Sequence, residues 1–142
     1  ETNMIEAFIK HFKEISPDIL TGYFSDGFDL PYLKSRCEKL KIKLNLGLDN
    51  SIPKFSGGMS PKGRISGITH IDLYQFIESA YSQYLQSETL GLGDVANELL
   101  GEKKIIHEFK RSEKMKEEEW QNFFAYNLQD AVLTNKLFFQ LI

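Results

Sequence analysis

The stretch from Leu20 to Leu33 constrains the fold more than any other part of the sequence, because it places an acid between two regular elements. An apolar run reaches a Ser-Asp-Gly turn at 25–27, and Asp29 then stands directly before Leu30, Pro31 and an amphipathic segment. This order predicts a strand, a loop and a helix. In open α/β sheets, functional groups collect beyond the carboxyl ends of strands. Asp29 is therefore either a metal ligand or, as Asp often is, the N-cap of the helix.

The composition fits a single domain with a substantial core. Of the 142 residues, 42% are hydrophobic and 13% are aromatic, which is enough apolar material for one domain of common size. No apolar stretch approaches the roughly 20 residues that a membrane-spanning helix needs, and no secretory signal is recognisable. Cys37 is the only cysteine, which excludes an internal disulfide and fits a small packing residue in a reducing compartment. A soluble protein with no membrane partner is therefore expected.

Basic residues occur in local groups, although the net charge of the chain is −3. Binding of a polyanion would therefore depend on these groups and not on the domain as a whole. The groups are Lys34 with Arg36, Lys62 with Arg64, and the run from Lys103 to Lys116. Such a group is more often a solvated face than a binding site, so charge alone does not assign nucleic-acid binding.

Apolar spacing and breaker residues predict the elements around this stretch. Residues 5–15 have the spacing of an amphipathic helix, with Asn3 and Glu6 placed as a capping box and Pro17 as the stop. Residues 18–23 have the pattern of a short buried strand, and the helix after Asp29 is expected to run to about residue 40.

The segment between Asn45 and Gly67 is rich in glycine and proline, which predicts a segment on the surface, outside the core. Its flanks, Ile52–Phe55 and Arg64–Ile68, could pair across the long loop Gly57–Gly63. We expect a protruding β-hairpin, although a plain surface loop fits the same composition equally well.

Two further elements are predicted before the end of the chain. Thr69–Asp72 has the pattern of a second strand that ends in an acid, for which an N-cap role is favoured over metal binding, and an aromatic-rich helix follows over Leu73–Tyr84. A short helix is predicted within Leu90–Gly101, with Gly101 as its stop.

The closing segment, Glu117–Ile142, is predicted to be one long helix. The apolar residues available for its buried face are Trp120, Phe123, Phe124, Leu128, Val132, Leu137 and Leu141. Tyr126 and Asp130 are four residues apart, so their side chains project from the same side of the helix. Such a pair can bind a metal ion and orient a water molecule, but a half-buried tyrosine beside a solvated acid is the more frequent arrangement.

Several segments, taken in order, resemble the exonuclease domain of family B DNA polymerases, in particular the archaeal ones. Residues 23–33, Tyr-Phe-Ser-Asp-Gly-Phe-Asp-Leu-Pro-Tyr-Leu, are similar to the second exonuclease motif of that family. Residues 126–130, Tyr-Asn-Leu-Gln-Asp, are similar to the third motif. Between them, residues 63–64 and 70–74 fall where archaeal members carry a Gly-Arg-Ile and an Asp-Leu-Tyr segment. The resemblance covers nearly the whole chain.

This resemblance implies a ribonuclease H-like exonuclease fold, and residues 1–142 would form part of a proofreading 3′→5′ exonuclease domain. In that family four carboxylates hold two divalent ions, Mg²⁺ or Mn²⁺, about 3.5 to 4 Å apart. Asp130 would ligate the metal that activates the attacking water, Asp29 would hold the second metal directly or through water, and Tyr126 would align the nucleophile. The implied DNA contacts are Tyr23, Phe24, Phe28 and Arg64. The hairpin at 52–67 would help to pass the primer strand between the polymerase and exonuclease sites.

The sequence departs from the family pattern in two places. The first exonuclease motif, an Asp-x-Glu pair, is absent, so we expect a fold truncated at its N-terminal strands and no appreciable exonuclease activity in the chain alone. Phe24 stands where the motif usually has an asparagine, and Gly27 likewise replaces a common asparagine. Phenylalanine cannot make the hydrogen bonds of an amide, but it can stack on a base. Editing by the parent enzyme would therefore be weaker or altered.

These inferences predict a piece of an enzyme, a DNA-directed DNA polymerase with 3′→5′ exonuclease activity. Its partners would be a single-stranded 3′ end of DNA and the remainder of the polymerase chain, in the cytoplasm at the nucleoid. A sheet edge left open by a missing strand would also allow pairing with a second copy, which makes a dimer a further expectation. Two alternatives stay open: a non-catalytic DNA-binding or structural module that keeps the fold, and a free-standing nuclease of the same superfamily.

Overall fold

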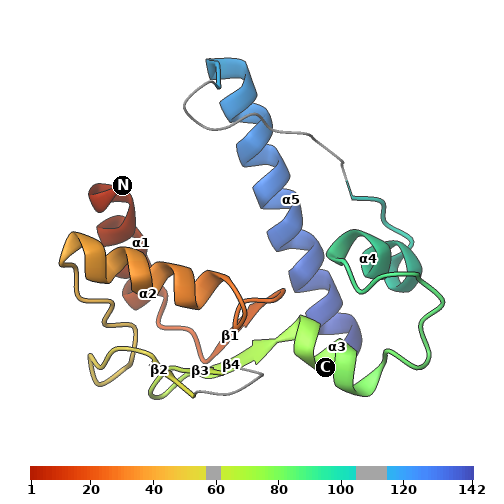
Figure 1. Cartoon of the computed structure of the whole chain (residues 1–142), viewed down its shortest axis with the longest axis horizontal. Helices are drawn as coiled ribbons and strands as arrows, with labels where there is room; N and C mark the ends of the chain where they lie inside the picture. Colours follow the sequence, from red (N-terminus) through yellow and green to blue (C-terminus); the bar gives the residue numbers. More distant parts are fainter. Residues whose placement is uncertain (57–61, 105–114) are drawn as a thin grey trace. The chain divides into compact units, whose positions relative to one another are not determined.

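The computed structural model describes residues 1–56, 62–104 and 115–142 of the chain. These residues form two compact units, Glu1–Asp72 and Leu73–Ile142, whose elements are labelled in Figure 1. Helices and strands are both present, so the predicted α/β class is confirmed. The assignment of residues 1–142 to one partial exonuclease domain stays a prediction.

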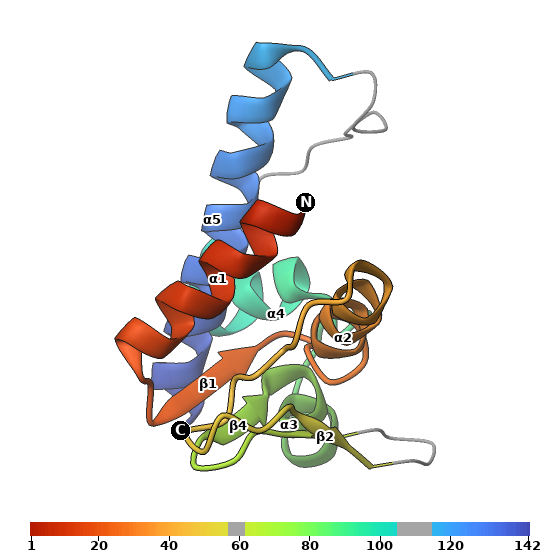
Figure 2. The same ribbon diagram turned by 90° about the vertical axis from the view of Figure 1, so that its left-hand side faces the viewer.

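The first unit combines two helices with two short strand pairs. Its elements are α1 (Thr2–Ile15), β1 (Ile19–Gly22), α2 (Asp29–Leu40), β2 (Lys54–Phe55), β3 (Gly63–Arg64) and β4 (Thr69–Asp72). β1 and β4 pair in parallel, and their last residues, Gly22 and Asp72, stand opposite each other. α1 and α2 lie on the same side of this pair (Figures 1 and 2). The loop that leaves β1 therefore starts beside the acid that ends β4.

The core of the first unit is built from α1, α2 and the segments that follow α2. Its buried members are Ile5, Ile9, Phe12, Cys37, Leu44, Leu46, Ile65 and Ile68. Ile5, Ile9 and Phe12 lie on one face of α1, as their helical spacing predicts. Cys37 is buried as expected, and this burial raises the pKa of its thiol.

The start of α1 differs from the prediction. The helix already begins at Thr2, with Glu1 as its N-cap and no side-chain capping hydrogen bond. The predicted capping box of Asn3 and Glu6 is therefore wrong, because both residues lie within the helix. Glu1 instead forms an ion pair with Arg36 of α2, and the guanidinium satisfies both oxygens of its carboxylate.

The strand β1 is less buried than its apolar sequence suggests. Ile19 is 47% exposed, and the other residues of β1 are only half-buried. The reason is that β1 pairs with a single strand, β4, within the described part of the chain. The prediction of a buried strand is therefore wrong in this respect, and the dimer through an open sheet edge stays a prediction.

The two segments that flank the glycine-rich loop pair with each other. β2 and β3 are antiparallel, with Lys54 opposite Arg64 and Phe55 opposite Gly63. The tip of the predicted hairpin, residues 57–61, lies outside the described residues. The pairing of the flanks is thus present, while the protruding hairpin itself stays a prediction.

A hydrogen-bonded carboxylate, Asp49, gives the first unit a measurable dependence on pH. It accepts hydrogen bonds from the Ser51 backbone N–H (2.9 Å) and the Ser66 hydroxyl (3.0 Å). Hydrogen bonds from Ser51, and then from Ser66, lower the pKa of Asp49 to about 2. Because the folded pKa lies below the unfolded one, Asp49 contributes stability above about pH 4 that is lost as the pH falls toward the folded value.

Replacing Asp49 by asparagine should remove this dependence. We expect the free energy of unfolding of Asp49→Asn to lie below that of the wild type near neutral pH, because asparagine carries no charge. The difference should shrink as the pH falls from about 4 toward 2. Urea titrations at several pH values measure this. A difference that stays constant with pH would contradict the role of the Asp49 charge.

In its described residues, the second unit contains three helices, α3 (Leu73–Ala80), α4 (Leu92–Leu100) and α5 (Glu117–Leu141). Its buried apolar residues are Leu73, Ile77, Val95, Ala96, Leu133 and Leu137. α4 ends at Gly101 in a left-handed conformation (φ 68°), as predicted, whereas α3 ends before the predicted Tyr84. In the described part of the chain, no helix is both long enough and apolar enough to cross a membrane.

The buried face of α5 is much smaller than its sequence suggests. Phe124, Leu128 and Val132 are exposed by 56%, 67% and 43%, so their predicted burial is wrong. The buried residues of α5, Leu133, Thr134 and Leu137, all belong to its second half. α3 and α4 thus bury only that half of the helix within the described residues.

Candidate functional site

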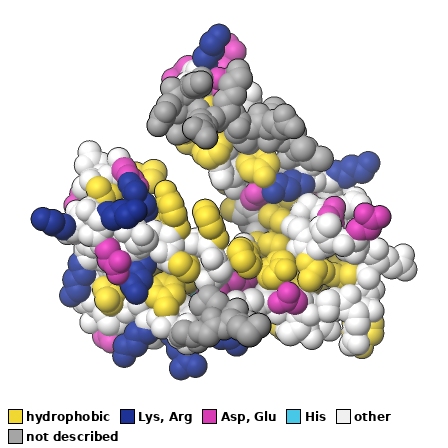
Figure 3. All heavy atoms as spheres, in the orientation of Figure 1, with side chains coloured by type: hydrophobic (Ala, Val, Ile, Leu, Met, Phe, Trp, Pro, Cys, Tyr) yellow, Lys and Arg dark blue, Asp and Glu magenta, His cyan; other side chains and the backbone are white. Residues whose placement is uncertain are grey.

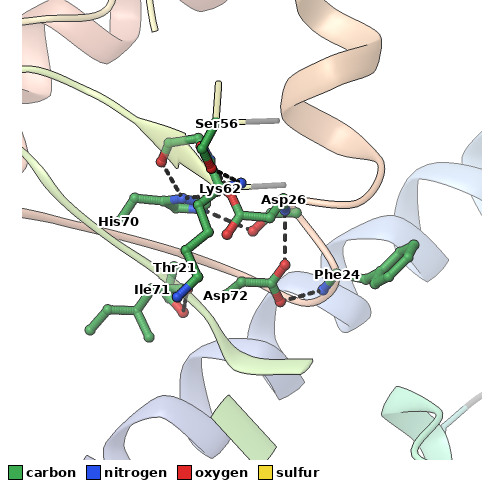
Figure 4. A network of polar contacts seen from close by, with 10 residues as sticks. Thr21, Phe24, Asp26, Ser56, Lys62, His70, Ile71 and Asp72 are labelled. Atoms are coloured by element: carbon green, nitrogen blue, oxygen red, sulfur yellow. Dashed lines mark hydrogen bonds and ion pairs between the residues drawn. The ribbon is translucent and has the colours of Figure 1, made fainter. Parts of the chain in front are cut away.

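The loop between β1 and α2, residues 23–28, is held by the acid that ends β4. Asp72 is buried; its Oδ1 accepts the N–H of Phe24 (2.9 Å) and its Oδ2 accepts the N–H of Asp26 (2.8 Å). Figure 4 shows this carboxylate directed at the loop backbone. The sequence predicted Asp72 to be an N-cap or a metal ligand, and its use as a clamp for the loop was not foreseen.

A second set of buried polar side chains ties the same loop to β3. Asp26 Oδ1 accepts the N–H of Gly63 (2.5 Å) and lies 3.3 Å from Nδ1 of His70. His70 Nδ1 also lies 3.1 Å from the carbonyl oxygen of Gly63, so this nitrogen carries the proton. Its Nε2 then accepts a hydrogen bond from the Ser25 hydroxyl (2.9 Å). Residues 24–26 of the loop are therefore held by contacts with both β3 and β4.

Phe24 has an unusual backbone conformation within this loop. Its φ of 65° lies in the left-handed region, which Asn and Gly tolerate better than an aromatic residue. The two hydrogen bonds to Asp72 keep the backbone in this conformation. The Phe24 side chain is 47% exposed and points away from the polar network in Figure 4.

Asp29 is the first residue of α2 and is exposed to solvent. Phe28 is the N-cap, and the helix has no side-chain capping hydrogen bond, so the N-cap interpretation of Asp29 is wrong. Although the side chain is exposed, surrounding protein reduces its hydration, and this desolvation raises the pKa of Asp29, with a smaller contribution from the charge of Asp72. The carboxylate is thus presented at the end of a rigid loop, where a cation would favour its ionised form.

The other predicted DNA contacts of the first unit are also near its surface. Tyr23 is half-buried, whereas Phe28 is 59% exposed. Arg64 is exposed on β3 and stands opposite Lys54. Phe24 and Phe28 therefore lie in the loop that leads to Asp29. The hydrogen bond from Gly63 to Asp26 links this loop to β3, the strand that carries Arg64.

The predicted pair on α5 has a third member. Lys104 Nζ lies 2.9 Å from Oδ2 of Asp130 and 4.7 Å from the ring centroid of Tyr126. Burial acts to lower the pKa of Lys104, but hydrogen bonds with Tyr126 and Asp130 outweigh it and raise that pKa above its ordinary value. Sequence reasoning missed Lys104 because it treated the lysine-rich connection as solvated, and only the repeated lysines at 103–104 could have drawn attention to it.

The two oxygens of Asp130 have different surroundings. Oδ2 is paired with Lys104, whereas Oδ1 is buried and has no hydrogen-bond partner among the described residues. Within the described ranges, no three His, Cys, Asp or Glu side chains gather closely enough to hold a metal ion. Asp29 and Asp130 belong to different compact units, and each of them contributes a single carboxylate.

Lysine and arginine side chains are spread over the visible face of the first unit (Figure 3), and the basic groups found in the sequence differ in how far they are paired with acids. Lys34 pairs with Glu38 (3.9 Å), and Arg36 pairs with Glu1, so most of the charge of this group is compensated within the protein. Most of the run from Lys103 to Lys116 lies outside the described residues. Lys62 and Arg64 form no ion pair with any described residue, so the charge of this group is not compensated within the part of the chain that the structure describes.

Comparison with known proteins identifies relatives for nearly the whole chain. Residues 1–90 match the family described as DNA polymerase family B, exonuclease domain. The chain is 36% identical over 148 aligned positions to a DNA polymerase of Pyrococcus glycovorans, covering 96% of this chain and 18% of that protein. It is 34% identical over 144 positions to a DNA polymerase of Thermococcus kodakarensis, covering 96% of this chain and 8% of that protein.

The fold also has a counterpart among solved structures. It is similar to the structure of the family B DNA polymerase from the hyperthermophilic archaeon Pyrobaculum calidifontis, with a TM-score of 0.74 and 25% sequence identity. This match covers 94% of the present chain and 17% of the other. The chain thus spans less than a fifth of the length of each of these relatives.

Proposed function

The chain belongs to the exonuclease-domain family of the family B DNA polymerases, which confirms the resemblance of its motifs, and we propose that it forms part of a proofreading 3′→5′ exonuclease domain. The substrate in this proposal is the single-stranded 3′ end of DNA. The remainder of a polymerase chain is the partner, which is supported by the length of the relatives. A ribonuclease H-like topology with a protruding hairpin at 52–67 belongs to the same proposal.

The observation that carries the proposed chemistry is the buried, unpartnered Oδ1 of Asp130. A buried carboxylate oxygen without a hydrogen bond is costly, and a bound cation would remove that cost. Carboxylate oxygens are the ligands that Mg²⁺ and Mn²⁺ prefer, so Asp130 and the exposed Asp29 fit as ligands of divalent ions. Such ions supply charge stabilisation for the phosphate oxygens during hydrolysis.

The remaining residues of the proposed site would bind the DNA strand or orient the reacting groups. Tyr126 lies on the same side of α5 as Asp130, where its hydroxyl would align an attacking water. Lys104 holds one oxygen of Asp130 at 2.9 Å and thereby fixes the position of this carboxylate. In the first unit, Tyr23, Phe24, Phe28 and Arg64 would contact the DNA strand.

Lys104 also gives a specific reason to keep the second candidate, a non-catalytic DNA-binding module. Its ammonium group already neutralises Asp130, as a metal ion would. In a module that has lost editing, this ion pair would be a structural replacement for the metal. The two candidates therefore differ in whether a divalent ion binds at Asp130.

Excision by the longer polymerase distinguishes these functions. A primer with a mispaired 3′ nucleotide is incubated with the enzyme and Mg²⁺, without nucleotides, and shortening of the primer is followed over time. The exonuclease proposal expects shortening that chelation of the metal abolishes and that is slower on a paired terminus. Tight binding of the same DNA without shortening would support the non-catalytic module instead.

A further inference from the structure

We propose that Phe24, Phe28 and Tyr32 form an aromatic shelf on which successive bases of single-stranded DNA stack, and that Gly27 is what makes room for Phe24 in it. The inference deepens the proposed function, on which it rests for the nature of the ligand. It assigns Tyr32 as a binding residue and gives a physical reason for the two departures from the family motif.

The three aromatic residues recur at intervals of four along the loop and the first turns of α2. The N–H of Phe28 donates to the carbonyl of Phe24 (3.0 Å), and the N–H of Tyr32 donates to that of Phe28 (2.9 Å). The rings of Phe28 and Tyr32 stack with centroids 5.6 Å apart and an angle of 12° between their planes. The exposed fractions of Phe24, Phe28 and Tyr32 are 47%, 59% and 51%. Large flat rings are thus held in a fixed arrangement and yet remain open to solvent.

Phe24 and Gly27 are sterically dependent on each other. A Cβ atom added to Gly27 would lie 2.4 Å from Cζ of Phe24 and 2.6 and 2.7 Å from its two Cε atoms. The phenyl ring therefore occupies the space that any side chain at position 27 would need. The replacement of two asparagines by Phe24 and Gly27 is thus one coupled change, which exchanges amide groups for an aromatic surface.

Basic residues on the strand pair that contacts the shelf loop favour a nucleic-acid strand as the occupant of the shelf. Lys54 and Arg64 stand directly opposite each other on β2 and β3, an arrangement that is unfavourable for like charges unless an anion lies between them. Neither forms an ion pair with a described residue. β3 is joined to the shelf loop by the hydrogen bond from Gly63 to Asp26. Phosphates on the basic pair and bases on the shelf are the two contacts that single-strand binders combine.

Stacking on this shelf has a consequence for specificity. Every base has a π-face, so stacking tolerates all four bases, whereas an amide reads hydrogen-bonding groups. The shelf would hold the DNA end next to Asp29 whatever its sequence. We therefore expect single-strand affinity to depend little on which bases occupy the end.

A double-mutant cycle on the 142-residue chain tests the proposal without using catalysis. The probe is a labelled oligothymidylate that carries 2-aminopurine near its 3′ end, titrated in EDTA so that nothing is hydrolysed. Fluorescence anisotropy reports binding, and quenching of 2-aminopurine reports stacking. We expect Phe24→Ala, Gly27→Ala and Tyr32→Ala each to weaken binding at least about fivefold, the lower end of the measured cost of losing a stacked base, and to reduce quenching.

The double variant Phe24→Ala/Gly27→Ala should bind no more weakly than Phe24→Ala alone, because the added methyl group then has no ring to displace. Tyr84→Ala and Phe139→Ala serve as controls, since these residues are exposed by 72% and 75% on the other unit, and their affinity should equal that of the wild type. Absence of binding by the wild type, or unchanged quenching in the shelf variants, would overturn the shelf. Failure of the proposed function would appear elsewhere, as excision that survives loss of Asp29 and Asp130.

Discussion

Excision of a mispaired 3′ nucleotide by the longer polymerase should fall by several powers of ten when Asp130 is replaced by asparagine. The single variant Asp29→Asn should show a loss of similar size. Residues that act as one catalytic unit commonly show losses of this size. Asparagine keeps the shape of the side chain and removes the negative charge that would hold a divalent ion. The effect should therefore appear in kcat much more than in KM, because the proposed DNA contacts are aromatic and basic side chains and not these two acids.

Matched acids in each unit serve as controls for this result. Asp18→Asn in the first unit and Asp94→Asn in the second remove exposed carboxylates away from the site, and both variants should excise as fast as the wild type. Loss of Asp130 also removes the partner of Lys104, so thermal unfolding of Asp130→Asn must show that the fold persists. Wild-type excision in both Asp29→Asn and Asp130→Asn would exclude the proposed metal site. Unequal losses would instead show that the two metals contribute differently.

Features encoded by neighbouring residues could be predicted from the sequence. The strand Thr69–Asp72 and the long closing helix have the predicted bounds to within a residue, because the periodicity and the breakers of these segments are local. The approach of Tyr126 to Asp130 follows from helical spacing alone. Local pattern also placed Asp29 at the junction of a loop and a helix, although the N-cap role that it suggested for Asp29 is wrong.

Features that depend on distant residues could not be predicted. Asp72 reaches the loop only because β1 and β4 pair in parallel, which joins residues 48 positions apart. Lys104 meets Asp130 across 26 residues, a separation at which helical spacing cannot pair two side chains. The exposure of Phe124 and Leu128 could not be predicted either, because the spacing of residues identifies an apolar face of a helix but not what covers that face.

Asp72 should prove the most important residue of the site for stability, although it is not proposed to bind metal. Its buried carboxylate accepts the N–H groups of Phe24 and Asp26, and Asp72→Ala removes this acceptor from both of them. Each buried unsatisfied group costs about 1–3 kcal/mol, so Asp72→Ala should lower the free energy of unfolding by about 3 kcal/mol. Phe24 would then have little reason to keep its left-handed conformation.

Asparagine at position 72 separates the contribution of geometry from that of charge. Its single carbonyl oxygen can still accept one of the two N–H groups, so Asp72→Asn should lose about half as much stability as Asp72→Ala. Urea unfolding measures both values, with Asp18→Ala as the exposed control. Excision by the longer enzyme should fall in the same order, because the loop that presents Asp29 is progressively released. If Asp72→Ala unfolds like the wild type, the clamp does not hold the loop, and the rigidity of Asp29 must come from the Asp26 and His70 contacts alone.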